Sequence, residues 1–148
     1  MSHPQNIVAA AVVTALNAAT FSQEFTALRR YGPRFNVEDS TDVEVLVIPR
    51  SDSDGDGTVG LDTRKIVIHV GVFKRLANSV DAETAEMDDM TSLCREIYEA
   101  FYQKRIGASS EIVNVDVDND PPYSVEDLVE RRVFLSVVEL TFLIDVAV

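Results

Sequence analysis

The sequence predicts an α+β domain with a largely antiparallel sheet, packed by an N-terminal helix and one long central helix. Residues 65–74 alternate strictly, with apolar side chains at every second position, as on one face of a strand. From Met87 to Phe101, apolar residues recur at steps of three and four, as on one face of a helix. Further β-branched runs are separated by segments rich in Gly, Pro and Asp. The expected order is α-β-β-β-α-β-β, with one helical turn before the last strand.

Composition limits the classes of function. The chain has 148 residues and is 46% hydrophobic, which suits one domain over residues 1–148 with its own core. Its 25 acidic and 13 basic residues give a net charge of −12, which repels phosphate and argues against specific nucleic-acid binding. The single cysteine, Cys94, lies on the apolar helix stripe, so we expect a core residue in a reducing compartment.

The N-terminal third is expected to begin with a helix. Asn6 can cap an alanine-rich helix over residues 7–17, which is too short for a membrane span and has no basic segment before it. We therefore expect a cytoplasmic chain without membrane contact. Alternation predicts a strand over residues 24–31, followed by a turn at Gly32 and Pro33.

The middle of the chain predicts two strands joined by a long connection. Val43 to Ile48 form a confident alternating run, and Pro49 is expected to end it. Residues 51–63 are polar and glycine-rich, which predicts a loop between this strand and the strand over 65–74. His69 lies within that second strand, where a structural role is expected.

The long helix is expected to begin at an Asp81 N-cap and to continue to Arg105. Acidic residues crowd its first turns and Lys104 and Arg105 lie in its last turn, as the helix dipole favours, and Gly107 is expected to stop it.

The C-terminal part predicts a short strand over 112–117, a break at 118–122, a capped helical turn from Ser124 to Glu130 and a last strand over 132–145. This last strand is apolar on both faces, apart from Glu139. It is expected either in the middle of the sheet or half-covered by another copy of the chain.

One motif resembles part of a metal site. Asp52, Asp54 and Asp56 match the first oxygen ligands of a calcium loop, and Gly57 matches its glycine. The twelfth position should be a bidentate Glu, but it is Thr63. We interpret the segment as a solvated hairpin tip with at most weak cation binding. Nucleophile elbows, phosphate loops and dinucleotide fingerprints are absent from the sequence, so we expect no catalytic residue, metal site or cofactor.

Two segments suggest contacts with partners, namely the last strand, which is apolar on both faces, and a basic patch before the second predicted strand. Arg29, Arg30 and Arg34 surround Tyr31 and form a small basic patch on a very acidic chain. Such a patch either meets an acidic patch on a neighbouring subunit or is simply solvated.

The order of these segments is similar to that of the tail terminator, or tail-completion, proteins of long-tailed bacteriophages. The similarity lies in the arrangement across nearly the whole chain and not in one short motif, and head-closure and connector rings of the phage neck share much of it. The segments that carry it, after the N-terminal helix, are residues 25–31, 43–50, 66–75, 87–105, 119–123 and 134–142.

The resemblance implies a structural virion protein, assembled in the host cytoplasm. It would form a hexameric ring that binds the last ring of the tail tube, stops its polymerisation and joins it to the head-neck proteins. DNA would pass through the lumen without specific binding, which an acidic chain suits. The loops 52–63 and 118–123 would then contact neighbours, through Asp52, Asp54, Asp56, Asp118, Asp120 and Tyr123.

Other interpretations stay open at this point. The chain can instead be a different neck ring, or a cellular homo-oligomeric binding module, which would require a concave apolar pocket. An enzyme would require perturbed carboxylates clustered around His69.

Overall fold

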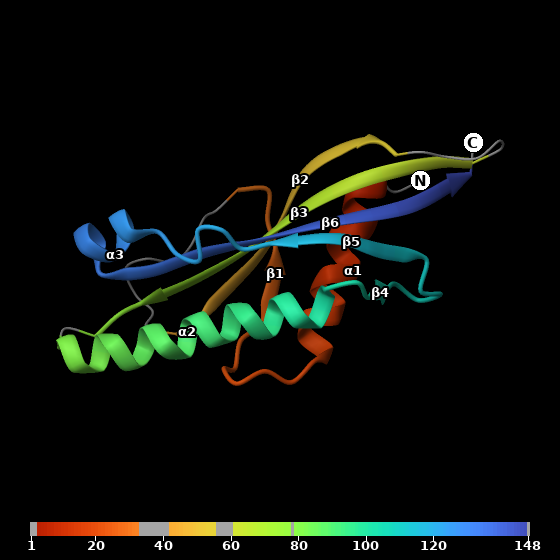
Figure 1. The fold of residues 1–148 in the computed structure, drawn as a ribbon. Helices are drawn as coiled ribbons and strands as arrows, with labels where there is room; N and C mark the ends of the chain where they lie inside the picture. The colour runs from red at the N-terminus through yellow and green to blue at the C-terminus, as the bar shows by residue number, and fades with distance from the viewer. Residues whose placement is uncertain (1–2, 33–41, 56–60, 78, 148) are drawn as a thin grey trace.

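The fold is α+β, with a mixed sheet (Figure 1). The computed structural model describes residues 3–32, 42–55, 61–77 and 79–147. Within these residues, six strands form one sheet in the order β1-β2-β3-β6-β5-β4, in which β1 and β2 are parallel and the other pairings are antiparallel. The elements are α1 (Pro4–Ala18), β1 (Ala27–Arg29), β2 (Glu44–Asp54), β3 (Leu61–Arg75), α2 (Val80–Phe101), β4 (Arg105–Ile106), β5 (Ile112–Asp118), α3 (Val125–Arg131) and β6 (Val133–Ala147).

The centre of the sheet is the antiparallel pairing of β3 with β6. The two strands pair without interruption from Leu61↔Ala147 to Arg75↔Val133. Because side chains alternate along each strand, Ile68 and its partner Leu140 face the same side of the sheet, and both are fully buried. The last strand therefore lies inside the sheet, which is one of the two positions expected for it.

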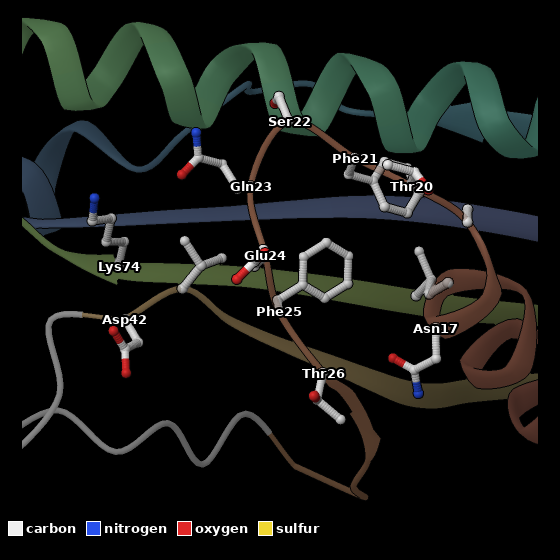
Figure 2. Close-up of a pocket in the computed structure, with 13 residues that line it drawn as sticks. Asn17, Thr20, Phe21, Ser22, Gln23, Glu24, Phe25, Thr26, Asp42 and Lys74 are labelled. Atoms are coloured by element: carbon white, nitrogen blue, oxygen red, sulfur yellow. The ribbon is translucent and has the colours of Figure 1, made fainter.

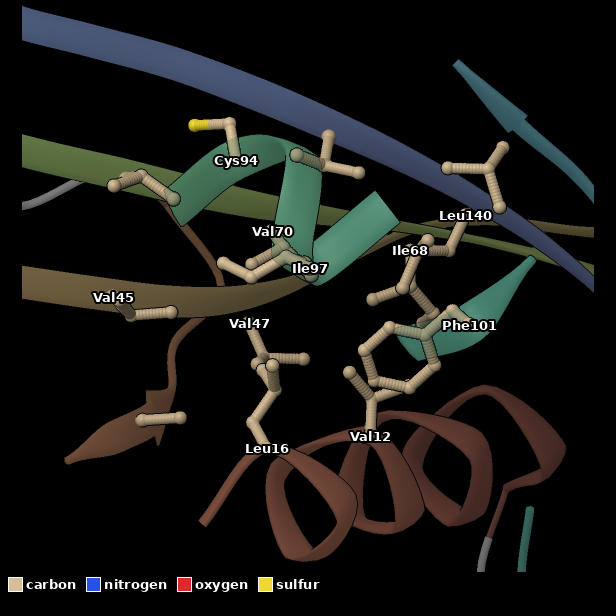
Figure 3. Packing of buried hydrophobic residues seen from close by; sticks show 14 of the residues in the cluster. Val12, Leu16, Val45, Val47, Ile68, Val70, Cys94, Ile97, Phe101 and Leu140 are labelled. Atoms are coloured by element: carbon tan, nitrogen blue, oxygen red, sulfur yellow. The ribbon is translucent and has the colours of Figure 1, made fainter. Parts of the chain in front are cut away.

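Both long helices cover one face of this sheet (Figure 1). Figure 3 shows Val12 and Leu16 of α1 and Ile97 and Phe101 of α2 directed at the same strand side chains. The Phe101 ring meets the Phe142 ring edge-on, with centroids 6.2 Å apart. Each such fully buried side chain contributes about 1.5–3 kcal/mol. No helix in the described part of the chain is long and apolar enough to cross a membrane.

The N-terminal helix begins earlier than expected, and the strand after it is shorter. The N-cap is His3, whose ring nitrogen accepts a hydrogen bond from the Gln5 amide, and not Asn6. The predicted strand over 24–31 is wrong except for Ala27–Arg29. The chain just before it is fixed to α2, because Ser22 donates hydrogen bonds to the Glu96 carboxylate through its amide and hydroxyl.

The predicted loop over 51–63 is wrong at both of its ends. β2 continues to Asp54 and β3 begins at Leu61. Pro49 does not end β2, because the pairing register shifts between Pro49 and Ser51, and a bulge tolerates a residue without an amide hydrogen. Residues 56–60 lie outside the described residues.

The central helix is displaced from its predicted bounds. Ser79 caps it through a 3.2 Å bond to the Ala82 amide, in place of Asp81. It ends at Phe101, so Lys104 lies beyond the last turn and Gly107 is not the stop. Its end is set by β5, since Asn114 donates its amide hydrogen to the Lys104 carbonyl.

The side chain of Asn114 is a buried polar link between α2 and the sheet. It accepts a bond from the Gln103 amide at 3.1 Å and donates to the carbonyl oxygens of Asp116 and Thr141 at 3.0 and 3.2 Å. Gln103 has a φ of 55°, in the left-handed region, and this turn directs the chain from the helix into β4. The same side chain therefore ends the helix and spans the register shift in β5.

Replacement of Asn114 tests this link. Asn114→Ala should lower the free energy of unfolding by about 2–4 kcal/mol, because it leaves three backbone groups without their partner in a buried site. Urea unfolding followed by circular dichroism measures the change. Gln103→Ala is the control, since that side chain is exposed, and it should change stability by about 0.5 kcal/mol or less. Equal stabilities of the two variants would contradict the assigned role.

Burial also predicts a pH effect at Cys94. Burial raises the pKa of its thiol from 9.0 to about 11, while a hydrogen bond with Ser136 acts in the opposite direction. Between these pH values the unfolded chain loses the thiol proton and the folded chain keeps it, so stability should fall as pH rises. The stability advantage of the wild type over Cys94→Ala should shrink by about 2 kcal/mol from pH 9 to pH 11. An advantage that stays constant would contradict this account.

Candidate protein–protein interaction sites

The predicted basic patch lies on β1 and the residues after it. Arg29 and Arg30 are exposed, and Tyr31 is 70% exposed. The Arg29 guanidinium carbon lies 5.9 Å from the centroid of the Tyr31 ring, and Arg30 donates to the Arg29 carbonyl at 2.8 Å. Arg34 lies outside the described residues. The part of the patch that the structure describes is therefore a cationic and aromatic surface.

The outer edge of β1 is closed by a side chain of α1. The Asn17 amide accepts a bond from the Ala27 amide at 2.8 Å and donates to the Ala27 carbonyl at 3.2 Å. It occupies the groups that another strand would pair with, which is a common way to protect a sheet edge. This surface can therefore contact partners through side chains more readily than by strand addition at Ala27.

The acidic residues of the hairpin are held by an arginine. The Arg64 side chain donates from Nε to Asp52 at 2.8 Å and from Nη1 to Asp54. His3 of α1 also lies 3.4 Å from Asp52. Asp56 lies outside the described residues. Two of the three carboxylates in the calcium-like motif are thus engaged by a cation of the chain itself.

The turn after β5 carries two exposed acids on a braced backbone. Asp118 and Asp120 are exposed, and Asn119 between them donates to the Ser136 hydroxyl at 2.9 Å and to the Val137 carbonyl at 2.8 Å. Tyr123 is half-buried, with its ring centroid 6.4 Å from that of Phe134. The two acids therefore present charge to the surface, while most of the Tyr123 ring supports the core.

A groove of about 390 Å³ lies between this turn and α2. On its helix side, the Arg95 guanidinium carbon lies 4.8 Å from the Tyr98 ring centroid, and Arg95 Nε donates to Glu99 at 3.0 Å. We call this the β5 groove; it is lined by Thr91, Arg95, Tyr98, Val117, Asp118, Asn119 and Asp120.

A second groove, of about 920 Å³, lies between the end of α1, the chain leading to β1 and the ends of β2 and β3 (Figure 2). Phe21 and Phe25 stack in it with ring centroids 5.4 Å apart. Lys74 on its other side lies 3.1 Å from Glu86. Most of the lining side chains are polar, so this groove is not the apolar pocket that a small-molecule binding module would require.

The predicted contact residues lie in three separate parts of the molecule. β1 lies at one edge of the sheet, and the turn after β5 lies toward the other edge. Figure 1 shows the outer end of the β2–β3 hairpin beside the two termini, at the end of the sheet opposite α3. These residues therefore do not converge on one site.

His69 and Glu139 are paired across the central strands. The His69 Nε2 atom lies 3.0 Å from Glu139 Oε2, and Asp118 pairs in register with Glu139 on the next strand. This agrees with the structural role predicted for His69. In the described residues, no group of three or more histidine, cysteine or acidic side chains could hold a metal ion.

Comparison with known proteins gives no family for this chain. No family model matches the sequence, and no curated protein matches it.

The arginine at the hairpin end should stabilise the fold. Arg64→Ala should lower the free energy of unfolding by about 1–3 kcal/mol, since the Arg64 and Asp52 side chains are 22% and 14% exposed and lose their charge-assisted bonds. The loss should be smaller in high salt, and urea unfolding at two salt concentrations measures it. The matched control is Arg95→Ala, which breaks an exposed pair and should cost about 0.5 kcal/mol or less. Equal losses would contradict the special role of Arg64.

Proposed function

We propose that this chain is a structural virion protein of the tail terminator type. In this proposal it forms a hexameric ring that caps the tail tube of a long-tailed phage, ends its polymerisation and joins it to the head-neck proteins. The observation that carries the proposal is the separation of the charged surface sites around one rigid sheet. A ring subunit needs contacts on two lateral sides and along the axis, whereas an enzyme needs its groups to converge.

The order of elements adds support. The helix, the strand pair with its hairpin, the long helix and the final strand follow each other as in the segments on which the resemblance rests. The β3–β6 pairing gives a rigid body, and the hairpin end and the turns extend from it. In the proposed ring, the hairpin end with Asp52 and Asp54 is assigned to axial contacts with the tube or the neck.

Net charge fits the same proposal. With −12 charges on each subunit, a ring of several copies would be strongly acidic as a whole. If its lumen shares that charge, it repels the phosphate backbone, so DNA could pass without being bound. A head-closure or connector ring would share this property and would differ in the partner that it binds.

The direct test is to mix the purified chain with the tail tube protein of the same phage and to image the product by electron microscopy. Tubes capped at one end by a six-fold ring, with growth halted there, are the expected result. Tubes that grow without limit and carry no cap would contradict the terminator function and favour a head-side neck protein.

A variant of the hairpin end makes the test specific. The Asp54 side chain is 86% exposed, so Asp54→Lys should weaken capping with a change in stability of about 1 kcal/mol or less. The control is Glu130→Lys, the same charge reversal at an exposed residue of α3, which should cap as the wild type does.

A further inference from the structure

We propose that the basic segment Arg29–Arg30–Tyr31 of one copy binds in the β5 groove of the next copy. This inference rests on the proposed ring and names the side chains that would form its lateral contact. It follows from the shape, charge and position of the two surfaces.

The basic segment has the composition of an interface anchor. Tyr31 projects with 70% of its surface exposed, and its hydroxyl donates a long hydrogen bond, 3.3 Å, to Asn6. Leu28, three residues before it in the chain, is 44% exposed. Neither Arg29 nor Arg30 forms an ion pair with another described residue. Tyrosine and arginine are the residue types that most often dominate the energy of protein interfaces.

The β5 groove offers the complementary surface. Asp118 and Asp120 are exposed on its rim, and neither forms an ion pair within the described residues. Val117 and Tyr98 supply apolar surface, and about 390 Å³ is enough space for an aromatic ring with a guanidinium beside it. Among the described residues that line the groove, Arg95 is the one cation, and it is already paired with Glu99.

The charges select this pairing on an otherwise acidic molecule. Two arginines of one copy, which have no ion pair among the described residues, would face two such aspartates of the next, whereas most other exposed surface would repel a second copy at a net charge of −12. Within the described residues, β4 and the residue before it pair with Ile112, Val113 and Asn114 of β5, and the strand edge toward Asp118 continues beyond them.

Position in the sheet determines the symmetry of the contact. β1 is the first strand of the sheet order, and β5 lies at the other side, next to β4. Because the two surfaces are different and lie on strands at different ends of the sheet order, each copy can bind one neighbour through each surface. Such head-to-tail contacts close into a ring when the rotation between copies allows it.

A charge exchange tests the contact. Native mass spectrometry and light scattering of the wild-type chain should show a closed oligomer. Arg29→Glu with Arg30→Glu should give monomers, and so should Asp118→Lys with Asp120→Lys. The chain that carries all four changes should assemble again, because the charges of both surfaces are then reversed and still attract each other.

Two further measurements avoid dependence on folding of the fourfold variant. Tyr31→Ala changes an exposed side chain and should weaken assembly by about tenfold or more with an unchanged thermal melt. An equal mixture of the two charge variants should assemble into an oligomer in which the variants alternate, since the two intact surfaces bind each other and the two reversed surfaces also attract each other.

Matched controls exclude a general effect of charge. Lys104→Glu with Arg105→Glu, and Asp89→Lys with Glu130→Lys, reverse equal numbers of exposed charges elsewhere and should assemble as the wild type does.

Several outcomes would overturn the contact. These are a monomeric wild type, an oligomer that survives both charge variants and Tyr31→Ala, or a mixture of the two variants that stays monomeric. A ring that forms through another surface and still caps tubes would refute this inference alone. A ring that depends on these residues but does not cap tubes would refute the proposed function alone.

Discussion

The pairing of β3 with β6 is the constraint on which the rest of the structure depends. Fifteen residues of each strand pair in continuous register, so the inward side chains of both form one apolar surface. α1 and α2 cover that surface, and β2 and β5 extend the sheet on either side. A shift of one residue would turn the inward side chains of one of the two strands outward, so either Ile68 or Leu140 would leave the core and the helices would lose part of their packing surface.

Periodicity predicted the elements better than it predicted their ends. The alternation of residues 65–74 and the stripe of the central helix were sufficient for β3 and α2, because burial of one face dictates both patterns. The ends were set by single polar contacts between segments far apart in sequence. Asn114 ends the central helix, and Ser22 with Glu96 draws the chain before β1 away from the sheet. No local pattern contains such a contact, so Gly107 gave the wrong stop.

The candidate surfaces could be predicted only where they are contiguous in sequence. Arg29, Arg30 and Tyr31 are neighbours, and their character is visible without a structure. The β5 groove joins α2 to the turn after β5, so the sequence suggested its two aspartates but not Tyr98 on the facing helix. At the hairpin, glycine and aspartate favoured a loop, and strand pairing with Arg64 outweighed that local preference.

The distribution of paired and unpaired charges connects stability to assembly. Arg64, Lys74, Arg95 and Arg131 have acidic partners within the chain. Arg29 and Arg30 have no such partner among the described residues, although acids outnumber bases in the sequence by 25 to 13. Two unpaired cations beside an exposed tyrosine give little to the stability of a single chain, since water solvates them well. When the same groups lie against an acidic groove in a second copy, they attract it and exclude water. This part of the surface therefore stabilises an assembly rather than a single chain.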